Sequence, residues 1–174
     1  MSQPLPASAK IRRLALLADT HGQIHEGLLA WLENMDLIVH AGDIGSDSVL
    51  DTLARLAPVV AVRGNNDVPE KWAGNAANAR ALPLDATLDL PGGKLQVVHG
   101  HQWPAAASRH RRLRESFPDV RCVAYGHSHR RVIDKEKTPW VVNPGAAGRS
   151  RAFGGAGFVE ITLGENWSVL ARAL

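Results

Sequence analysis

The sequence predicts an α/β fold in which strands alternate with helices in the first half and follow one another closely in the second. Apolar, β-branched runs of strand length recur along the chain. Segments with helical spacing of apolar residues separate the early runs, and such segments become sparse after residue 120. Alternating strands and helices favour parallel βαβ units, and closely spaced strands favour hairpins, an arrangement that allows two sheets.

The predicted elements follow in order along the chain. Strands are expected at residues 11–18, 37–41, 58–62, 95–98, 121–125, 139–142, 157–163 and 167–172. Helices are expected at 24–33 and 47–56, because their apolar residues recur on one helical face. Ser46 or Asp47 is expected to cap the second helix, and Pro58 to end it. Residues 67–85 are the least regular and predict a loop with room for one helical turn.

Length and composition favour one globular domain. The chain has 174 residues, of which 45% are hydrophobic and 21% are charged. We expect a single domain over residues 11–174, preceded by a flexible N-terminal arm at residues 1–10. The arm lacks the basic start and apolar middle of a signal peptide. No apolar run reaches the roughly 18 residues of a membrane helix, so no membrane partner is expected.

Charge and cysteine content limit the cellular compartments and the classes of partner that are expected for the protein. The net charge of +3 permits acidic or phosphate-bearing substrates without requiring nucleic acid. Cys122 is the only cysteine, which excludes a disulfide within the chain and suits a reducing cytosol. We therefore expect a cytoplasmic protein in which Cys122 is a small buried side chain.

Asp, Asn and His residues follow five of the apolar runs, at the point where each run ends. The five segments are LLADTH, VHAGD, VRGNND, VVHGH and AYGHSH. Residues two apart in an extended segment point the same way, so Asp19 and His21 are expected on one side of the chain. Ligands of open α/β sheets bind outside the carboxyl ends of strands, so these five ends are expected to converge.

The converging side chains predict a site for two divalent metal ions. The candidate ligands are Asp19, His21, Asp43, Asn65, His99, His127 and His129. Carboxylate, amide oxygen and imidazole bind divalent transition metals, and seven such ligands suit two ions ~3.5–4 Å apart. One Asp or His at a strand end is more often a hydrogen-bonded structural residue. Five such ends together favour the metal site, because burying so many ionisable groups without a cation is costly.

The same segments resemble the motifs of the calcineurin-like metallophosphoesterase superfamily. Its pattern is D-x-H, G-D, G-N-x-[D/E], a His-led segment and G-H-x-H. This chain reads D-T-H, G-D, G-N-N-D, H-G-H and G-H-S-H, across residues 14 to about 150. Its length and the later NPGAAGRSR most resemble small bacterial and archaeal phosphodiesterases, a group related to the retromer subunit of the same fold. The resemblance implies a four-layer αββα sandwich, in which helices flank two mixed β-sheets.

The resemblance also implies a role for each candidate ligand. The implied ligands are Asp19, His21 and His129 for the first metal, Asn65, His99 and His127 for the second, and Asp43 bridging both. His101 would then face the substrate or support a ligand. Manganese is the expected metal, and nickel, iron, cobalt and zinc are alternatives that suit the same ligands.

The implied reaction is hydrolysis of a small soluble phosphate ester by a metal-bound hydroxide. The residues expected to act in catalysis are Asp43, Asn65, Asn66, Asp67 and His101. Many superfamily phosphatases have His where this chain has Asn66. Asn cannot donate a proton as a general acid, so this departure favours phosphodiesters over monoesters and argues against a protein Ser/Thr phosphatase. The expected protein is thus a metal-dependent phosphodiesterase.

Two other functions stay open. One is a non-catalytic protein-binding scaffold like the related retromer subunit, in which the metal-site histidines are incompletely kept, whereas every ligand position is present here. The other is a nucleotide or nucleic-acid phosphoesterase, which needs a long basic groove. The chain has one basic segment, residues 109–114, and a solvated helix face is the favoured interpretation, so nucleic acid is not the expected partner. Homo-oligomers are compatible with exposed strand edges.

A few residues near the motifs have two interpretations. His40 is expected to be buried and to support the site rather than to bind metal. Asp67 either orients Asn65 or a metal-bound water, or caps its loop. Arg149 and Arg151, in the Gly-rich turn, either contact substrate phosphate or lie on the surface.

Overall fold

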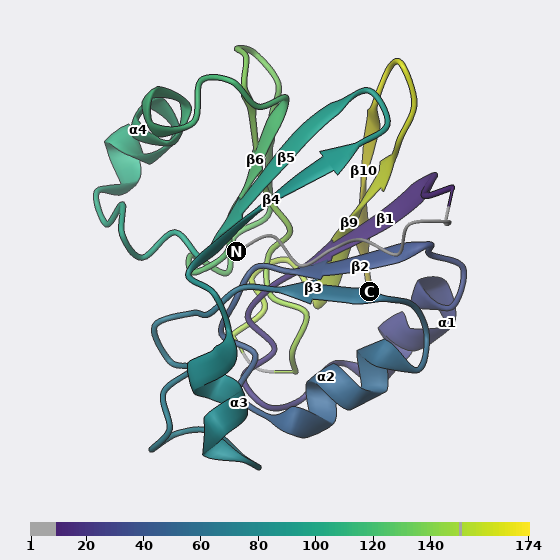
Figure 1. Cartoon of the computed structure of the whole chain (residues 1–174), viewed down its shortest axis with the longest axis vertical. Coiled ribbons are helices and arrows are strands. Elements are labelled where there is room, and N and C mark those ends of the chain that lie inside the picture. The colour runs from purple at the N-terminus through teal and green to yellow at the C-terminus, as the bar shows by residue number, and fades with distance from the viewer. Residues whose placement is uncertain (1–9, 150) are drawn as a thin grey trace.

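Two five-stranded mixed β-sheets pack face to face in the computed structural model, with helices on the outer face of each (Figure 1). The structure describes residues 10–149 and 151–174, so the predicted arm lies outside the described residues except for residue 10. The predicted four-layer αββα sandwich is confirmed. Across the described residues, no helix is long and apolar enough to cross a membrane.

The first sheet carries the early βαβ units. Its strands, in the order β10-β9-β1-β2-β3, are β10 (Ser168–Ala173), β9 (Gly157–Thr162), β1 (Arg13–Leu17), β2 (Leu37–His40) and β3 (Val59–Ala61). β1, β2 and β3 are parallel, while β9 and β10 add antiparallel neighbours. The carboxyl ends of β1, β2 and β3 therefore share one edge of the sheet.

The second sheet also has a parallel centre. Its strands, in the order β4-β5-β6-β8-β7, are β4 (Asp85–Leu90), β5 (Gly93–Val98), β6 (Cys122–Ala124), β8 (Trp140–Asn143) and β7 (Val132–Asp134). β5, β6 and β8 are parallel, and β4 and β7 pair antiparallel at the edges. The carboxyl ends of β5 and β6 therefore also lie at a common edge.

The helices are short. They are η1 (Glu26–Leu28), α1 (Leu29–Leu32), α2 (Asp47–Ala54), α3 (Ala76–Ala81), η2 (Ala106–Ser108) and α4 (Arg109–Ser116). The helix predicted at 24–33 is a 3₁₀ turn followed by one α-helical turn, and the irregular segment 67–85 contains all of α3. Ser46 caps α2, since its side chain accepts a hydrogen bond from the Val49 N–H.

Alternating strand residues build the layers of the first sheet. Leu14 and Leu16 of β1 are fully buried in the cluster between the two sheets, which also contains Val97 of β5. Leu17 belongs to the cluster under α1 and α2, with Leu53 of α2. Each fully buried leucine contributes about 1.5–3 kcal/mol of transfer free energy, so this alternation fixes which face of the sheet points inward.

The second sheet repeats this arrangement against α4. Cys122 and Ala124 lie in the cluster between the sheets, and Val123 packs with Leu113 of α4 on the outer face. α4 therefore lies on the side of the molecule opposite α1 and α2 (Figure 1). Cys122 is buried as predicted, and burial raises the pKa of its thiol to about 12.

Candidate metal centre

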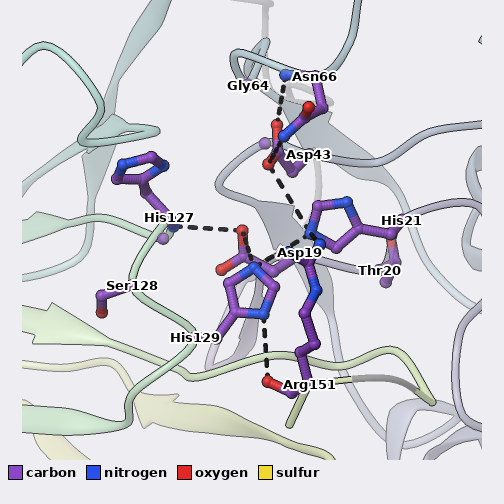
Figure 2. Close-up of polar contacts among 12 residues, drawn as sticks. Asp19, Thr20, His21, Asp43, Gly64, Asn66, His127, Ser128, His129 and Arg151 are labelled. Atoms are coloured by element: carbon purple, nitrogen blue, oxygen red, sulfur yellow. Dashed lines mark hydrogen bonds and ion pairs between the residues drawn. The ribbon is translucent and has the colours of Figure 1, made fainter. Parts of the chain in front are cut away.

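The carboxyl ends of strands from both sheets meet at one polar region (Figure 2). The predicted ligands come from five loops: Asp19 and His21 after β1, Asp43 after β2, Asn65 after β3, His99 after β5, and His127 and His129 after β6. The contacts described below bring all seven together. The first sheet supplies the carboxylates, the amide and one imidazole, and the second sheet supplies the other three imidazoles.

One group of ligand atoms comes from Asp19, His21 and His129, and these atoms lie within 4.8 Å of one another. The Nε2 atoms of His21 and His129 are 3.1 Å apart, and His129 Nε2 is 3.6 Å from Asp19 Oδ1. His129 Nδ1 donates to the backbone carbonyl of Arg151 at 3.2 Å (Figure 2). Because that nitrogen carries the proton, Nε2 presents its lone pair to the group.

A second group of ligand atoms comes from Asp19, Asp43 and His99. His99 Nε2 lies 3.4 Å from Asp43 Oδ2 and 3.1 Å from Asn65 Oδ1. His99 Nδ1 donates to the carbonyl of Ala41 at 2.8 Å, which joins the second sheet to the first and leaves Nε2 for a ligand. Asp43 also lies 3.8 Å from His21 Nε2, so its carboxylate faces both groups.

His127 lies beside the second group. Its ring centroid is 5.2 Å from that of His99 and 6.3 Å from that of His101. Its backbone N–H donates to Asp19 Oδ1 at 3.2 Å (Figure 2). Its imidazole does not belong to either three-residue group found among the described residues. Burial lowers the pKa of His127 to about 4, so its ring is neutral and able to bind a cation near neutral pH.

The backbone is strained at five of the seven predicted ligands. Positive φ angles between 48° and 68° occur at Asp19, His21, Asp43, His127 and His129. Among non-glycine residues with described geometry, only Arg151 shares this conformation. Left-handed backbone costs a non-glycine residue of order 1–3 kcal/mol and persists where the surroundings impose it, typically at functional sites. The five strained residues thus all belong to the loops in which the predicted ligands lie close together.

The electrostatics of the region fit a bound cation. Burial raises the pKa of Asp19 to about 7, and its Oδ2 is buried without a hydrogen-bond partner among the described residues. Burial alone would also raise the pKa of Asp43, but hydrogen bonds from His99 and Asn66 outweigh it and hold that pKa well below its usual range. A cation satisfies the unpaired oxygen and stabilises both carboxylates in their charged form.

Asn66 and Asp67 have different roles in the loop after β3. Asn66 donates to Asp43 through both its backbone N–H, at 2.8 Å, and its side-chain amide, at 2.7 Å. Asp67 is buried, and its two oxygens accept hydrogen bonds from the backbone N–H groups of Gly64 and Gly45 at 2.8 and 2.9 Å. The structure thus shows Asp67 as the cap that joins the loops after β2 and β3.

The other two histidines near the ligands differ in exposure. His40 is fully buried as predicted, and its Nε2 lies 3.0 Å from the hydroxyl of Thr20. Burial lowers its pKa to about 3, so it is neutral. His101 is half-buried, with its ring centroid 5.5 Å from that of His99, and burial lowers its pKa. His101 Nδ1 is a buried atom without a partner in the described part of the chain.

The arginines depart in part from the predictions. The basic segment is not simply a solvated face: Arg109 is buried and donates to the carbonyls of Trp103 and Pro104, and Arg114 pairs with Asp134 at 2.7 Å. Arg109 and Arg114 therefore stabilise the fold: Arg109 satisfies two backbone carbonyls, and Arg114 neutralises a carboxylate.

Arg149 and Arg151 lie in different surroundings. Arg149 is exposed and pairs with Glu26 at 3.2 Å. Arg151 is also exposed, but its Nη2 lies 3.3 Å from His21 Nε2 (Figure 2). The sequence reasoning did not identify Lys71, whose Nζ donates to Asn66 Oδ1 at 2.8 Å. Lys71 follows the G-N-N-D motif within the irregular segment 67–85, where no motif or periodicity marks it.

Comparison with known proteins agrees with this arrangement. A family model described as the calcineurin-like phosphoesterase superfamily domain matches residues 13–165. A probable metallophosphoesterase of Methanocaldococcus jannaschii is 30% identical over 139 residues, which cover 76% of this chain and 67% of that protein. A phosphodiesterase of the same organism is 25% identical over 142 residues, which cover 76% of this chain and 82% of that protein.

The solved structures extend the likeness to the fold. Vps29 of Entamoeba histolytica, in a complex with Zn²⁺, superposes with a TM-score of 0.72 at 18% identity, covering 92% of this chain and 97% of that chain. At this level of identity, the similarity concerns the fold alone.

Proposed function

We propose, on the premise that this chain belongs to the calcineurin-like phosphoesterase superfamily, that it is a dinuclear metal-dependent phosphodiesterase acting on a small soluble phosphate ester. Relatives named as a metallophosphoesterase and a phosphodiesterase support the reaction class. The observation that carries the proposal is the convergence of the ligand groups around Asp19, whose buried Oδ2 lacks a partner among the described residues.

Asp43 is the proposed bridge between the two cations. Its Oδ2 lies 3.8 Å from His21 Nε2 on one side and 3.4 Å from His99 Nε2 on the other. The two hydrogen bonds from Asn66 hold this carboxylate in place and favour its charged form. The remaining proposed ligands divide as the family pattern implies: Asp19, His21 and His129 on one side, and Asn65, His99 and His127 on the other.

Two divalent cations, when bound, would activate water and neutralise charge that develops on the phosphoryl oxygens. Manganese is the proposed metal, and the ligand set also suits nickel, iron, cobalt and zinc. The chain's own part is to hold the ligands, orient Asp43 through Asn66 and exclude water with the buried residues behind them. His101, with its ring beside the second group, is the residue we propose to face the substrate.

The side chain of Asn66 favours diesters as substrates. Its amide is committed to Asp43 and Lys71, and an amide cannot give a proton to a leaving group. A monoester with a poor leaving group needs that proton more than an activated diester does. We expect kcat/KM for bis(p-nitrophenyl) phosphate to exceed that for phenyl phosphate, an aryl monoester with a poor leaving group, and a strong monoester preference would contradict this assignment.

The proposal is tested by cleavage of bis(p-nitrophenyl) phosphate with Mn²⁺ and with EDTA. Asp43→Asn should reduce kcat by at least about 10³-fold, since both cation positions lose a charged ligand at once. Asp51→Asn, a matched change on the exposed face of α2, should keep wild-type activity. EDTA-resistant cleavage, or full activity in Asp43→Asn, would refute the metal mechanism.

A non-catalytic scaffold is the second candidate, favoured by the shared fold of Vps29. The two functions differ in one measurement. A scaffold would bind Mn²⁺ but would cleave neither monoesters nor diesters with any of the metals named above. The proposed enzyme cleaves the diester. The complete ligand set makes the enzyme the leading proposal.

A further inference from the structure

A small pocket adjoins the metal centre on the His21 side. It has a volume of about 210 Å³ and is lined by His21, Gly45, Asn66, Lys71 and Arg151. Two of these residues, His21 and Asn66, belong to or contact the proposed metal ligands. Whatever enters the pocket is therefore a neighbour of any phosphate held at the centre.

The charge of this pocket is positive. Among the described residues that line it, Lys71 and Arg151 are the only permanently charged ones, and none is a carboxylate. Neither Lys71 nor Arg151 has a carboxylate within salt-bridge distance among the described residues. By contrast, Arg149, in the same turn as Arg151, pairs with Glu26. Lys71 is instead anchored by its 2.8 Å hydrogen bond to Asn66, which fixes its ammonium at the edge of the centre.

Arg151 is tied to the metal centre at both ends. Its backbone carbonyl accepts from His129 Nδ1, and its Nη2 donates to His21 Nε2 at 3.3 Å (Figure 2). That nitrogen is a proposed metal ligand, so its lone pair is unavailable to the guanidinium once a cation binds there. The guanidinium, which lines the pocket, is then left without this acceptor. A planar guanidinium in that place suits a phosphate or carboxylate.

The size and lining of the pocket define its occupant. Drug-sized ligands fill pockets of about 300–1,000 Å³, and this one is smaller. None of the lining residues that the structure describes is a Phe, Tyr or Trp on which a nucleobase could stack. The occupant that matches is thus a compact anionic group.

We propose that Lys71 and Arg151 form an anion subsite, so that the preferred substrate is a phosphodiester carrying a second anionic group, phosphate or carboxylate, close to the scissile phosphate. This substrate class rests on the proposed phosphodiesterase function. Lys71 and Arg151 select the substrate through its second anionic group. The metal centre acts on its diester group.

The first test is a pair of substrates that differ by one charge. The Mn²⁺-loaded protein is assayed with methyl p-nitrophenyl phosphate and with its carboxymethyl counterpart. The ratio of kcat/KM, carboxymethyl over methyl, should exceed about tenfold in the wild type and fall to near one in Lys71→Gln/Arg151→Gln, since the charge-assisted contacts are gone. Arg149→Gln, the control from the same turn, should keep the wild-type ratio. A ratio near one in the wild type, or an unchanged ratio in the double variant, would overturn the subsite.

The second test does not depend on turnover. Calorimetry compares phosphonoacetate with methylphosphonate binding to the Mn²⁺-loaded wild type and double variant, in which Mn²⁺ chelation by the probe is the same. Phosphonoacetate chelates Mn²⁺ better than methylphosphonate in both proteins, so the expected result is a preference for phosphonoacetate that is about tenfold larger in the wild type than in the double variant. If neither ester is hydrolysed but this difference holds, the phosphodiesterase function fails and the subsite stands. If the difference is absent, the subsite fails.

Discussion

Asp67→Ala tests whether the loops that carry Asp43 and Asn65 are held together by one buried carboxylate. Asp67 accepts two backbone hydrogen bonds, from Gly64 at 2.8 Å and Gly45 at 2.9 Å, and only 1% of it is exposed. Removing a charged acceptor costs about 1.5–3 kcal/mol per hydrogen bond, so the free energy of unfolding should fall by about 3–6 kcal/mol. That is a large share of the ~5–15 kcal/mol typical of a domain.

The assay is urea unfolding of the metal-free protein, followed by far-UV circular dichroism. With a slope of about 2 kcal/mol per molar urea, the midpoint should fall by about 1.5–3 M. Asp51→Ala, on the exposed face of α2, is the control and should change stability by less than about 0.5 kcal/mol. A loss in Asp67→Ala of under about 1 kcal/mol would show that the carboxylate does not hold the loops, and the capping argument would be wrong.

Three further predictions concern the metal centre and its surroundings. Gly64→Ala should weaken Mn²⁺ binding by at least about tenfold, because the new Cβ would meet Asp43 Oδ1 and N. Gly164→Ala is the control and should not weaken binding, because its Cβ would meet nothing closer than 4.0 Å. Equal affinities of the two variants in calorimetry would contradict this prediction. His40 is neutral in the fold, with a pKa of about 3, yet binds a proton below about pH 6.5 when unfolded. Stability is therefore lost as pH falls: relative to His40→Gln, the metal-free wild type should lose about 2 kcal/mol between pH 7 and pH 5, and parallel pH profiles would refute it. Mn²⁺ at 100 times its Kd should stabilise the wild type by about 2.7 kcal/mol, and a similar shift in the Tm of Asp43→Asn would exclude Asp43 as a ligand.

Strands could be predicted from the sequence where a run of mainly apolar residues marked them. The runs that became β1 and β2 were identifiable because consecutive buried residues are apolar. The runs that became β5 and β9 were identifiable although each contains one buried polar residue, Gln96 and Glu160. β4 and β7 were not predicted. β4, with the sequence DATLDL, is an edge strand in which buried and more exposed residues alternate, so it has no apolar run. β7 has three half-buried residues, too few for any period.

The candidate site follows the same division. The proposed ligands could be selected from the sequence because each follows an apolar run, and the topology of parallel strands brings such ends to one edge. The capping role of Asp67 could not be separated from a catalytic one, since both require a carboxylate in that loop. Lys71 and the guanidinium of Arg151 reach the centre through the paths of irregular loops, which no periodicity records.

The proposed ligands are divided between two sheets, and this division has a mechanical consequence. Asp19, His21, Asp43 and Asn65 belong to one layer, while His99, His127 and His129 belong to the other. Cations bound to these proposed ligands would link the two sheets and would oppose any relative movement of the sheets. A partly folded chain in which only one sheet has formed would lack the proposed ligands that the other sheet supplies. Substitutions in the core between the sheets, far from any proposed ligand, should therefore lower the affinity for metal as well as the free energy of unfolding.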